Sequence, residues 1–152
     1  MINELMRLRN LGRYVVALES LNLENIDTLV TLVAEDVVFF DPFNDTQGKK
    51  AFHKIFSDML LNMKSHDFHV TQTAISAPVE GVSIAFLKWE LDAVISKSLG
   101  GSWHVKGCSE IHFSPEGLVT AHIDFWDVGR DFYERIPMLG SILRIIRKRL
   151  ES

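Results

Sequence analysis

Patterns typical of helices and patterns typical of strands occupy separate parts of this chain, and that separation most constrains its fold. Apolar residues recur at helical spacing over about residues 2–20, 25–33 and 48–63, and only the short run 37–40 between them has β character. Residues 66–127 instead alternate between apolar and polar, and turn residues divide them into strands. Strands segregated from helices indicate an α+β domain rather than a doubly wound fold. We therefore predict a strongly curved antiparallel sheet wrapped around N-terminal helices, with a cone-shaped pocket between them.

The predicted helices follow from their apolar faces. In the first helix, the residues at helical spacing are Leu8, Leu11, Val15 and Leu18, with Tyr14 on the same side. Asn22 or Asn25 can cap a short second helix. Its apolar residues are Ile26, Leu29, Val30 and Val33. The inner face of the third helix, about residues 48–63, consists of Phe52, Ile55, Phe56, Met59 and Leu60.

Turn residues set the limits of the predicted strands. Asp41-Pro42 ends the strand at 37–40, because proline lacks the N–H of a strand ladder, and residues 43–48 form a loop. Pro78 and Glu80-Gly81 predict a turn. One face of the strand that follows carries Ala85, Leu87, Trp89 and Leu91. The next strand has a face of Trp103, Val105, Gly107, Ser109, Ile111 and Phe113. We expect a single domain over 1–152, with 129–152 as a helical tail.

Charge and cysteine content exclude several classes of protein. The chain has 152 residues and a net charge of −4, so it offers no strongly basic surface, and we expect no nucleic-acid partner. Its single cysteine, Cys108, cannot form an internal disulfide and is expected to be a small packed residue rather than a nucleophile. Charged residues interrupt the N-terminal apolar stretch before it reaches the length of a signal peptide. We therefore expect a cytoplasmic protein.

Three residues near the end of the strand region are the best candidates for chemistry. His122, Asp124 and Trp126 alternate along one strand and therefore share a face, which we expect to line the hollow. The same alternation would also arise in an ordinary half-exposed strand with its polar residues in water. The remaining histidines show no spacing typical of a metal site, so we predict neither a metal nor a cofactor.

Residues 13–48 resemble the ketosteroid isomerases. The shared features are Arg-Tyr-Val-Val-Ala-Leu at 13–18, Phe-Asp-Pro-Phe at 40–43 and the glycine at 48. The resemblance implies that Asp41 is a catalytic base and that Tyr14 donates to an oxyanion. It also places Ser109 where that family has a second oxyanion donor, an aspartic acid that stays protonated.

The order of elements over about residues 8–127 resembles the wider nuclear transport factor 2-like, or cystatin-like, superfamily. That superfamily includes SnoaL-like polyketide cyclases and limonene epoxide hydrolases, and the resemblance makes Asp124 similar to a catalytic position. Tyr14, Asp41, His122 and Asp124 are therefore the predicted catalytic residues. The predicted ligand-binding residues are Phe56, Trp89, Trp103, Ser109 and Trp126. Two plainer readings remain open: Tyr14 as an ordinary core tyrosine, and Asp41 as the acceptor of an Asx turn.

These residues leave three functions open. The first is a cofactor-independent acid–base enzyme, such as an isomerase, dehydratase or polyketide cyclase, acting on a small hydrophobic molecule through Asp41, Asp124 or both. The second is a non-catalytic ligand-binding module with the same pocket. The third is an interaction protein.

The tail combines apolar Ile142, Leu143, Ile145, Ile146 and Leu150 with basic Arg144, Arg147, Lys148 and Arg149. We expect it to close one end of the pocket rather than to contact a membrane surface.

We predict that the protein is a homodimer. The outer face of the sheet would carry Cys108, Ile123 and Phe125, and a symmetry mate commonly covers such a patch. Sedimentation velocity at micromolar concentration should therefore give a mass of about twice that of the chain. A single species of 17.3 kDa would contradict the prediction.

Overall fold

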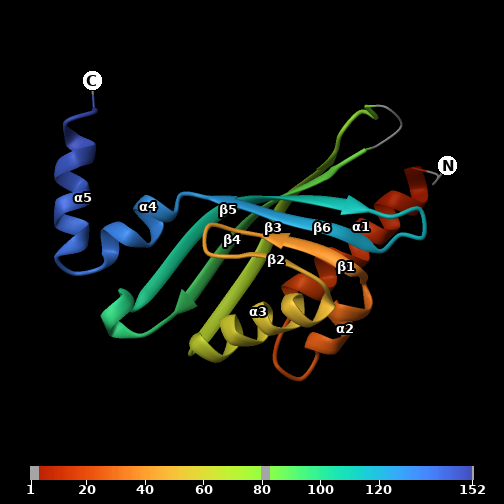
Figure 1. Ribbon diagram of the computed structural model, residues 1–152, viewed down its shortest axis with the longest axis horizontal. Coiled ribbons are helices and arrows are strands. Elements are labelled where there is room, and N and C mark those ends of the chain that lie inside the picture. Colours follow the sequence, from red (N-terminus) through yellow and green to blue (C-terminus); the bar gives the residue numbers. More distant parts are fainter. Residues whose placement is uncertain (1–3, 80–82, 152) are drawn as a thin grey trace.

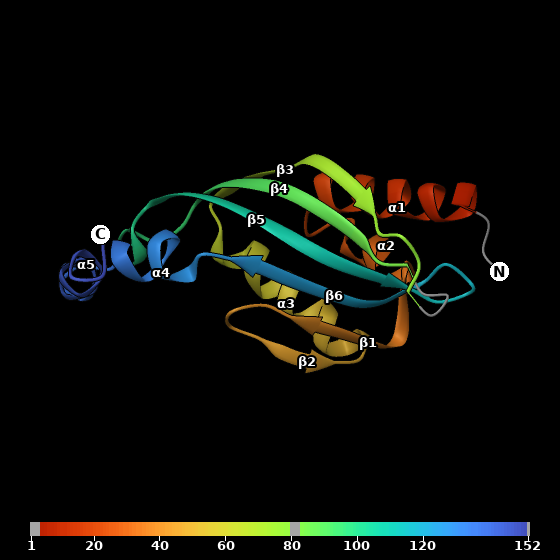
Figure 2. The ribbon, with the colours of Figure 1, turned by 90° about the horizontal axis from the view of Figure 1, so that it is seen from above.

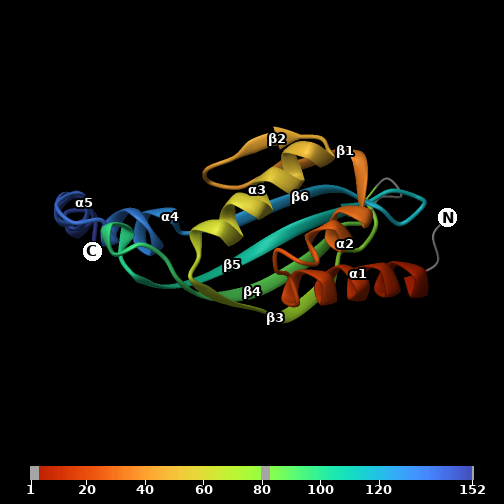
Figure 3. The ribbon, with the colours of Figure 1, turned by 90° about the horizontal axis from the view of Figure 1, so that it is seen from below.

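The computed structural model describes residues 4–79 and 83–151 and contains one curved six-stranded sheet with helices on its concave face (Figures 1 and 3). The helices are α1 (Glu4–Glu19), α2 (Ile26–Thr31), α3 (Lys49–Asn62), α4 (Val128–Asp131) and α5 (Leu139–Lys148), with 3-10 turns η1 (Lys97–Leu99) and η2 (Tyr133–Arg135). The strands are β1 (Val33–Phe40), β2 (Asp45–Gln47), β3 (Ser65–Ile75), β4 (Ala85–Val94), β5 (Ser102–Phe113) and β6 (Val119–Trp126). None of the described helices is long and apolar enough to cross a membrane.

The sheet has the order β2-β1-β6-β5-β4-β3. Strands β3 to β6 form the predicted antiparallel meander, and the α+β class with a strongly curved sheet is confirmed. The sheet is mixed, however, because β1 runs parallel to β6. Register shifts interrupt the β1–β6, β3–β4 and β5–β6 ladders, and such bulges bend a strand and increase its twist. Figure 2 shows the resulting curvature.

The concave face is filled by apolar side chains of the sheet and the helices. Helix α1 buries Leu11, Tyr14 and Leu18, whereas Leu8, predicted on the same face, is half exposed. Helix α3 buries Phe52, Phe56 and Leu60, as its spacing predicts. Strand β4 alternates between buried and exposed residues along its length, so Ala85, Leu87, Trp89 and Leu91 all face the core.

The ends of several elements differ from the sequence-based predictions. Val33 is the first residue of β1 and not part of the second helix, because Val119 of β6 pairs with it. The loop predicted at 43–48 contains β2, which pairs with the end of β1 and covers that edge of the sheet. Asn25 precedes α2 without a side-chain capping bond, since its side-chain oxygen accepts from the backbone N–H of Asn22. The turn predicted at Glu80-Gly81 lies outside the described residues.

The convex face of the sheet is not covered by the helices (Figures 2 and 3). It carries the cross-strand pair Cys108 and Phe125, and Phe125 is 52% exposed. Phe40, also an exposed residue, lies on the neighbouring strand β1. This is the face on which the homodimer was predicted, and that association stays a prediction.

Gly107 on β5 leaves room for the indole ring of Trp89 on the neighbouring strand β4. It pairs with Trp89 across the β4–β5 ladder, and a methyl group at position 107 would lie 2.3 Å from Cζ2 of the Trp89 indole. Only glycine therefore allows the indole to lie flat over β5. The contact fixes the position of a side chain that contributes to the candidate site.

Gly107→Ala is expected to lower the free energy of unfolding by about 1–3 kcal/mol, the usual cost of overpacking a core. Urea denaturation followed by tryptophan fluorescence measures the change. Gly12→Ala is the matched control, because nothing lies within 4 Å of a methyl group at that position in α1. The control should stabilise the protein by about 0.5–1 kcal/mol. Equal stability of the two variants would show that Gly107 does not provide this space.

Candidate active site

A cavity of about 520 Å3 lies between the concave face of the sheet and the helices. This volume suits a small organic ligand. Its walls are mainly apolar, with contributions from Phe39, Phe56, Leu91, Val105 and Ile95. His122 and Asp124 bring polar atoms into this apolar setting, and both come from β6.

Strand alternation on β6 directs His122, Asp124 and Trp126 into the cavity, as the spacing of these residues predicts. The imidazole of His122 is 3% exposed and contacts the rings of Phe39, Phe56 and Tyr14, with ring centroids 5.3–6.2 Å away. The Asp124 side chain is 18% exposed. The reading in which these residues simply lie in water is therefore wrong.

Tyr14, His122 and Asp124 form a hydrogen-bond chain. The Tyr14 hydroxyl lies 2.8 Å from Nδ1 of His122, and Nε2 of the same imidazole lies 2.9 Å from Oδ1 of Asp124. Helix α1 supplies the tyrosine from its buried face, so the chain joins this helix to the sheet. Residues separated by 108 positions in the sequence thus meet at one imidazole.

Two further hydrogen bonds connect Asp124 to the neighbouring strands β5 and β4. Ser109 lies opposite Asp124 in the β5–β6 register, and its hydroxyl donates to Oδ1 of the carboxylate. The indole N–H of Trp89 donates to the same hydroxyl over 2.8 Å. Ser109 is 1% exposed and lies behind Asp124 instead of lining the cavity. These hydrogen bonds from Trp89 on β4 and Ser109 on β5 therefore fix the orientation of the Asp124 carboxylate.

With Asp124 ionised, the protons of this network have one consistent arrangement. An ionised Asp124 accepts from Ser109 and from Nε2–H of His122, which leaves Nδ1 to accept from the Tyr14 hydroxyl. A second proton on the imidazole would turn Nδ1 into a donor and leave the buried tyrosine hydroxyl without an acceptor. The geometry therefore favours the neutral imidazole with its proton on Nε2.

The second carboxylate oxygen of Asp124, Oδ2, differs from Oδ1 in its hydrogen bonding. Both hydrogen bonds to Asp124 use Oδ1, and within residues 4–79 and 83–151 no group donates to Oδ2. No buried side-chain oxygen in this part of the chain lacks a partner, so Oδ2 is accessible. Since Asp124 lines the cavity, this accessible oxygen is available to a bound molecule. The arrangement fixes Oδ1 through two hydrogen bonds and leaves Oδ2 free to accept one from a bound molecule.

Tyr14 does not itself line the cavity and reaches the site only through His122. Complete burial raises the pKa of its hydroxyl well above 10.0, and the negative charge of Asp124 raises it further. The phenol therefore keeps its proton and acts as a permanent donor to His122. This geometry does not match the direct oxyanion contact that the resemblance to ketosteroid isomerases implies.

The carboxylate of Asp41 organises the loop that follows β1. Its Oδ1 accepts from the backbone N–H groups of Phe43 and Asn44 over 2.8 and 2.6 Å, and the side-chain amide of Asn44 donates to both oxygens. These are the bonds of an Asx turn, the plainer of the two readings of this residue. Asp41 lines the cavity, but its oxygens are engaged within the loop.

Aromatic side chains line the part of the cavity next to the tail. Trp126 contacts Phe43 and Trp103 edge to face, with ring centroids 5.4 and 5.7 Å apart. Phe132, which follows α4, packs on Phe43 and Trp103. The indole N–H of Trp103 donates to the backbone carbonyl of Asp131 over 2.6 Å and so attaches the start of the tail to the rim.

Some site residues were not found from the sequence. Phe39 and Phe43 flank Asp41 and were assigned only to a buried strand and a loop, although both line the cavity. Phe132 lies in a tail without regular periodicity, so no sequence pattern identified it. Of the predicted ligand-binding residues, Phe56, Trp89, Trp103 and Trp126 line the cavity, and their roles stay predictions. The described residues contain no group of three potential metal ligands.

The prediction that the tail helix closes one end of the pocket is wrong, because among the described tail residues only Phe132, which precedes α5, lines the cavity. No residue of α5 lines the cavity, and the helix extends beyond the end of the sheet (Figures 1 and 2). Cys108 also lies away from the cavity. Burial raises the pKa of its thiol, and the nearby Asp124 and Glu110 carboxylates raise it further, which agrees with a packed residue.

A strongly curved sheet closed by N-terminal helices around one apolar cavity defines the NTF2-like class of proteins, which has solved examples. One is an NTF2-like protein of unknown function from Exiguobacterium sp. 255-15, with 12% identity and a TM-score of 0.66 over 78% of this chain and 98% of that one. Within this class the chain belongs to the family of SnoaL-like domains, whose family model matches residues 13–122. None of the curated proteins compared with the chain matches it.

Two further solved structures have names that refer to an activity. A candidate polyketide cyclase from Xanthomonas campestris pv. campestris is 15% identical, with a TM-score of 0.65 over 85% of this chain and 96% of that one. The epoxide hydrolase/cyclase-like enzyme SalBIII, which has a role in pyran ring formation in the polyether salinomycin, is also 15% identical. Its TM-score is 0.67 over 87% of this chain and 98% of that one. At these identities the likeness concerns the fold.

The raised pKa of Tyr14 predicts how stability depends on pH. The folded protein holds this proton more tightly than the unfolded chain, whose tyrosines titrate near pH 10. Above about pH 10 the unfolded state therefore loses the proton first, and the free energy of unfolding should fall as pH rises. Urea denaturation at a series of alkaline pH values measures this decline. Tyr14→Phe should show a shallower decline, and an equal decline in both proteins would contradict the assignment.

Proposed function

We propose that this protein is a cofactor-independent acid–base enzyme for a small, largely apolar molecule, with Asp124 as its general base. The observation that carries the proposal is the position of Asp124, which lines a cavity of about 520 Å3: Oδ1 is held by His122 and Ser109, while Oδ2 has no donor among the described residues. A fixed carboxylate within reach of a bound molecule is what proton abstraction requires. Apolar walls limit competition from water.

The proposed reaction starts with removal of a proton from a carbon next to a carbonyl group. Oδ2 of Asp124 takes the proton, and the electron pair of the C–H bond passes into the carbonyl as an enolate. Return of the proton to another carbon gives isomerisation. Expulsion of a β-hydroxyl group, which takes the proton from Asp124 and leaves as water, gives dehydration. Attack of the enolate carbon on a second carbonyl, whose oxygen takes the proton from Asp124, gives cyclisation. All three outcomes share this first step, so the substrate decides between them.

His122 and Tyr14 act as positioning residues in this proposal. The Nε2–H of His122 neutralises part of the charge on Oδ1, and the Tyr14 hydroxyl keeps that proton on Nε2 by occupying Nδ1. Trp126 lies two residues beyond Asp124 on the same face and lines the cavity. Its indole N–H makes no hydrogen bond within the described residues, and we assign it as the donor to the oxygen of the bound molecule.

Asp41 is the competing base, and its contacts favour a different role. Its oxygens accept hydrogen bonds from Phe43 and Asn44, so a proton on this carboxyl would disrupt the loop that borders the cavity. Asparagine can accept the same bonds in an Asx turn. Asp124 instead offers an oxygen without a hydrogen-bond donor among the described residues. The two carboxylates can therefore be separated by substitution.

Asp124→Asn is expected to lower kcat by about 10²–10⁴-fold, the usual contribution of a general base, while folding and ligand binding persist. The asparagine oxygen can still accept from His122 and Ser109, so the network survives. Asp41→Asn is the matched control and should change kcat by less than about tenfold. Suitable assays are double-bond migration in β,γ-unsaturated ketones, followed by absorbance, and exchange of α-protons with deuterated water, followed by NMR.

Two results would contradict the proposal. If Asp41→Asn abolished turnover and Asp124→Asn did not, the base would be Asp41. If the wild-type protein bound apolar ketones but exchanged no proton on any member of a broad carbonyl panel, the site would be a binding module without catalysis. Equilibrium dialysis of the same panel separates that outcome from a simple failure to bind.

A further inference from the structure

Helix α5 turns its apolar side chains away from the protein. Ile142, Ile145 and Ile146 are 58%, 56% and 51% exposed, although helices of globular domains normally bury such residues. Figures 1 and 2 show this helix at the far end of the molecule, beyond the strands. Within the described residues no part of the domain covers these isoleucines.

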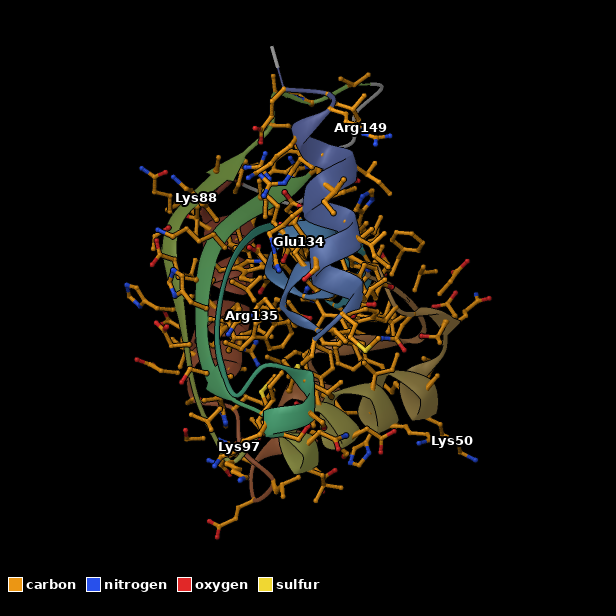
Figure 4. The ribbon with its side chains drawn as sticks, turned by 90° about the vertical axis from the view of Figure 1, so that its left-hand side faces the viewer. Lys50, Lys88, Lys97, Glu134, Arg135 and Arg149 are labelled. Carbon is orange, nitrogen blue, oxygen red and sulfur yellow. The ribbon has the colours of Figure 1, made fainter. Side chains whose placement is uncertain are left out.

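The helix is held to the preceding turn η2 by its polar side, and Arg135 of η2 donates in turn to the backbone carbonyls of Gly100 and Ser102. Arg147 binds the Glu134 carboxylate through Nε and Nη2 over 2.8 and 2.9 Å, and Arg144 donates to the Glu134 carbonyl over 2.6 Å. Gly140 is buried against that carbonyl, and a methyl group at this position would lie 1.9 Å from its oxygen. Figure 4, which looks onto α5 from its free side, shows Glu134 next to the helix. Because these contacts occupy the polar side of α5, its apolar side points into solvent.

Positive charge accompanies the exposed isoleucines. Residues 139–150 contain four basic side chains and no acidic one, whereas the whole chain has a net charge of −4. Lys148 and Arg149 form no ion pair with any described residue. By the helical period Ile142, Ile145, Ile146 and Arg149 share one side of α5. Figure 4 places Arg149 near the C-terminal end of the helix.

We propose that α5 docks the protein on an anionic lipid bilayer, with the three isoleucines at the boundary between headgroups and acyl chains and with Lys148 and Arg149 at the lipid phosphates. Apolar residues beside unpaired cations are the chemistry that such a surface recognises. A second copy of the chain fits less well, because a stable interface buries ~800 Å2 per partner, far more than three half-exposed isoleucines provide. No residue of α5 lines the cavity, so the proposal does not depend on the proposed enzyme activity.

Sedimentation with vesicles tests the electrostatic part of the proposal. The wild-type protein should pellet with vesicles of equal parts phosphatidylglycerol and phosphatidylcholine and should remain in solution with vesicles of phosphatidylcholine alone. Lys148→Glu combined with Arg149→Glu should weaken binding by at least about tenfold. Lys50→Glu combined with Lys88→Glu is the control, since both residues are exposed, neither forms an ion pair within the described residues, and the change in net charge is equal. Equal loss in both double variants would overturn the proposal.

A second pair of variants tests the apolar part. Ile145→Ser combined with Ile146→Ser should abolish pelleting with the anionic vesicles, while Val16→Ser combined with Leu61→Ser should not, because those exposed residues lie on α1 and α3. Circular dichroism checks that all variants fold. If the wild-type protein does not bind the anionic vesicles, the proposal is wrong. If, in addition, the isoleucine variant alone shifts the sedimentation coefficient from dimer to monomer, α5 is a protein interface.

Discussion

The hydrogen-bond chain through Tyr14, His122, Asp124, Ser109 and Trp89 is the interaction on which the rest of the site depends. It is the only route by which α1, β4, β5 and β6 exchange side-chain hydrogen bonds in the core of the described chain. His122 and Ser109 are both buried, and each has hydrogen-bond partners on both sides. Buried polar groups are costly unless satisfied, so this chain selects one register of β6 against its neighbours.

The curvature of the sheet leaves a cavity next to this hydrogen-bond network, so that a bound molecule can reach Asp124. Bulges bend the strands, and Gly107 allows the Trp89 ring to lie close to β5, where its N–H reaches Ser109. The walls of the cavity are mainly apolar, and Asp124 is one of the polar residues that line it. The aromatic rim formed by Phe43, Trp103, Trp126 and Phe132 then links the cavity to the tail.

Local periodicity was sufficient to predict most of the elements and buried faces, although it missed β2 and the orientation of α5. Alternation alone identified His122, Asp124 and Trp126 as one inward face, and helical spacing identified Tyr14 as buried. The parallel pairing of β1 with β6 was not predictable, because it joins segments far apart in the sequence and leaves no local pattern. The same limit applies to Asp41 and Asp124, whose roles differ through hydrogen bonds formed only in the fold, and to α5, whose polar side happens to meet Glu134.

The protonation of His122 tests the central claim most directly, since it reports whether the chain holds Asp124 as an ionised acceptor. Long-range nitrogen–proton NMR of the uniformly ¹⁵N-labelled protein at about pH 8, above the ordinary imidazole pKa of about 6.5, identifies which ring nitrogen carries the proton. The account predicts a neutral ring with its proton on Nε2 and an unprotonated Nδ1 that accepts from Tyr14. A proton on Nδ1 alone would reverse the hydrogen bonds of His122, make Tyr14 an acceptor and remove the donation from His122 to Asp124, and that result would contradict the account.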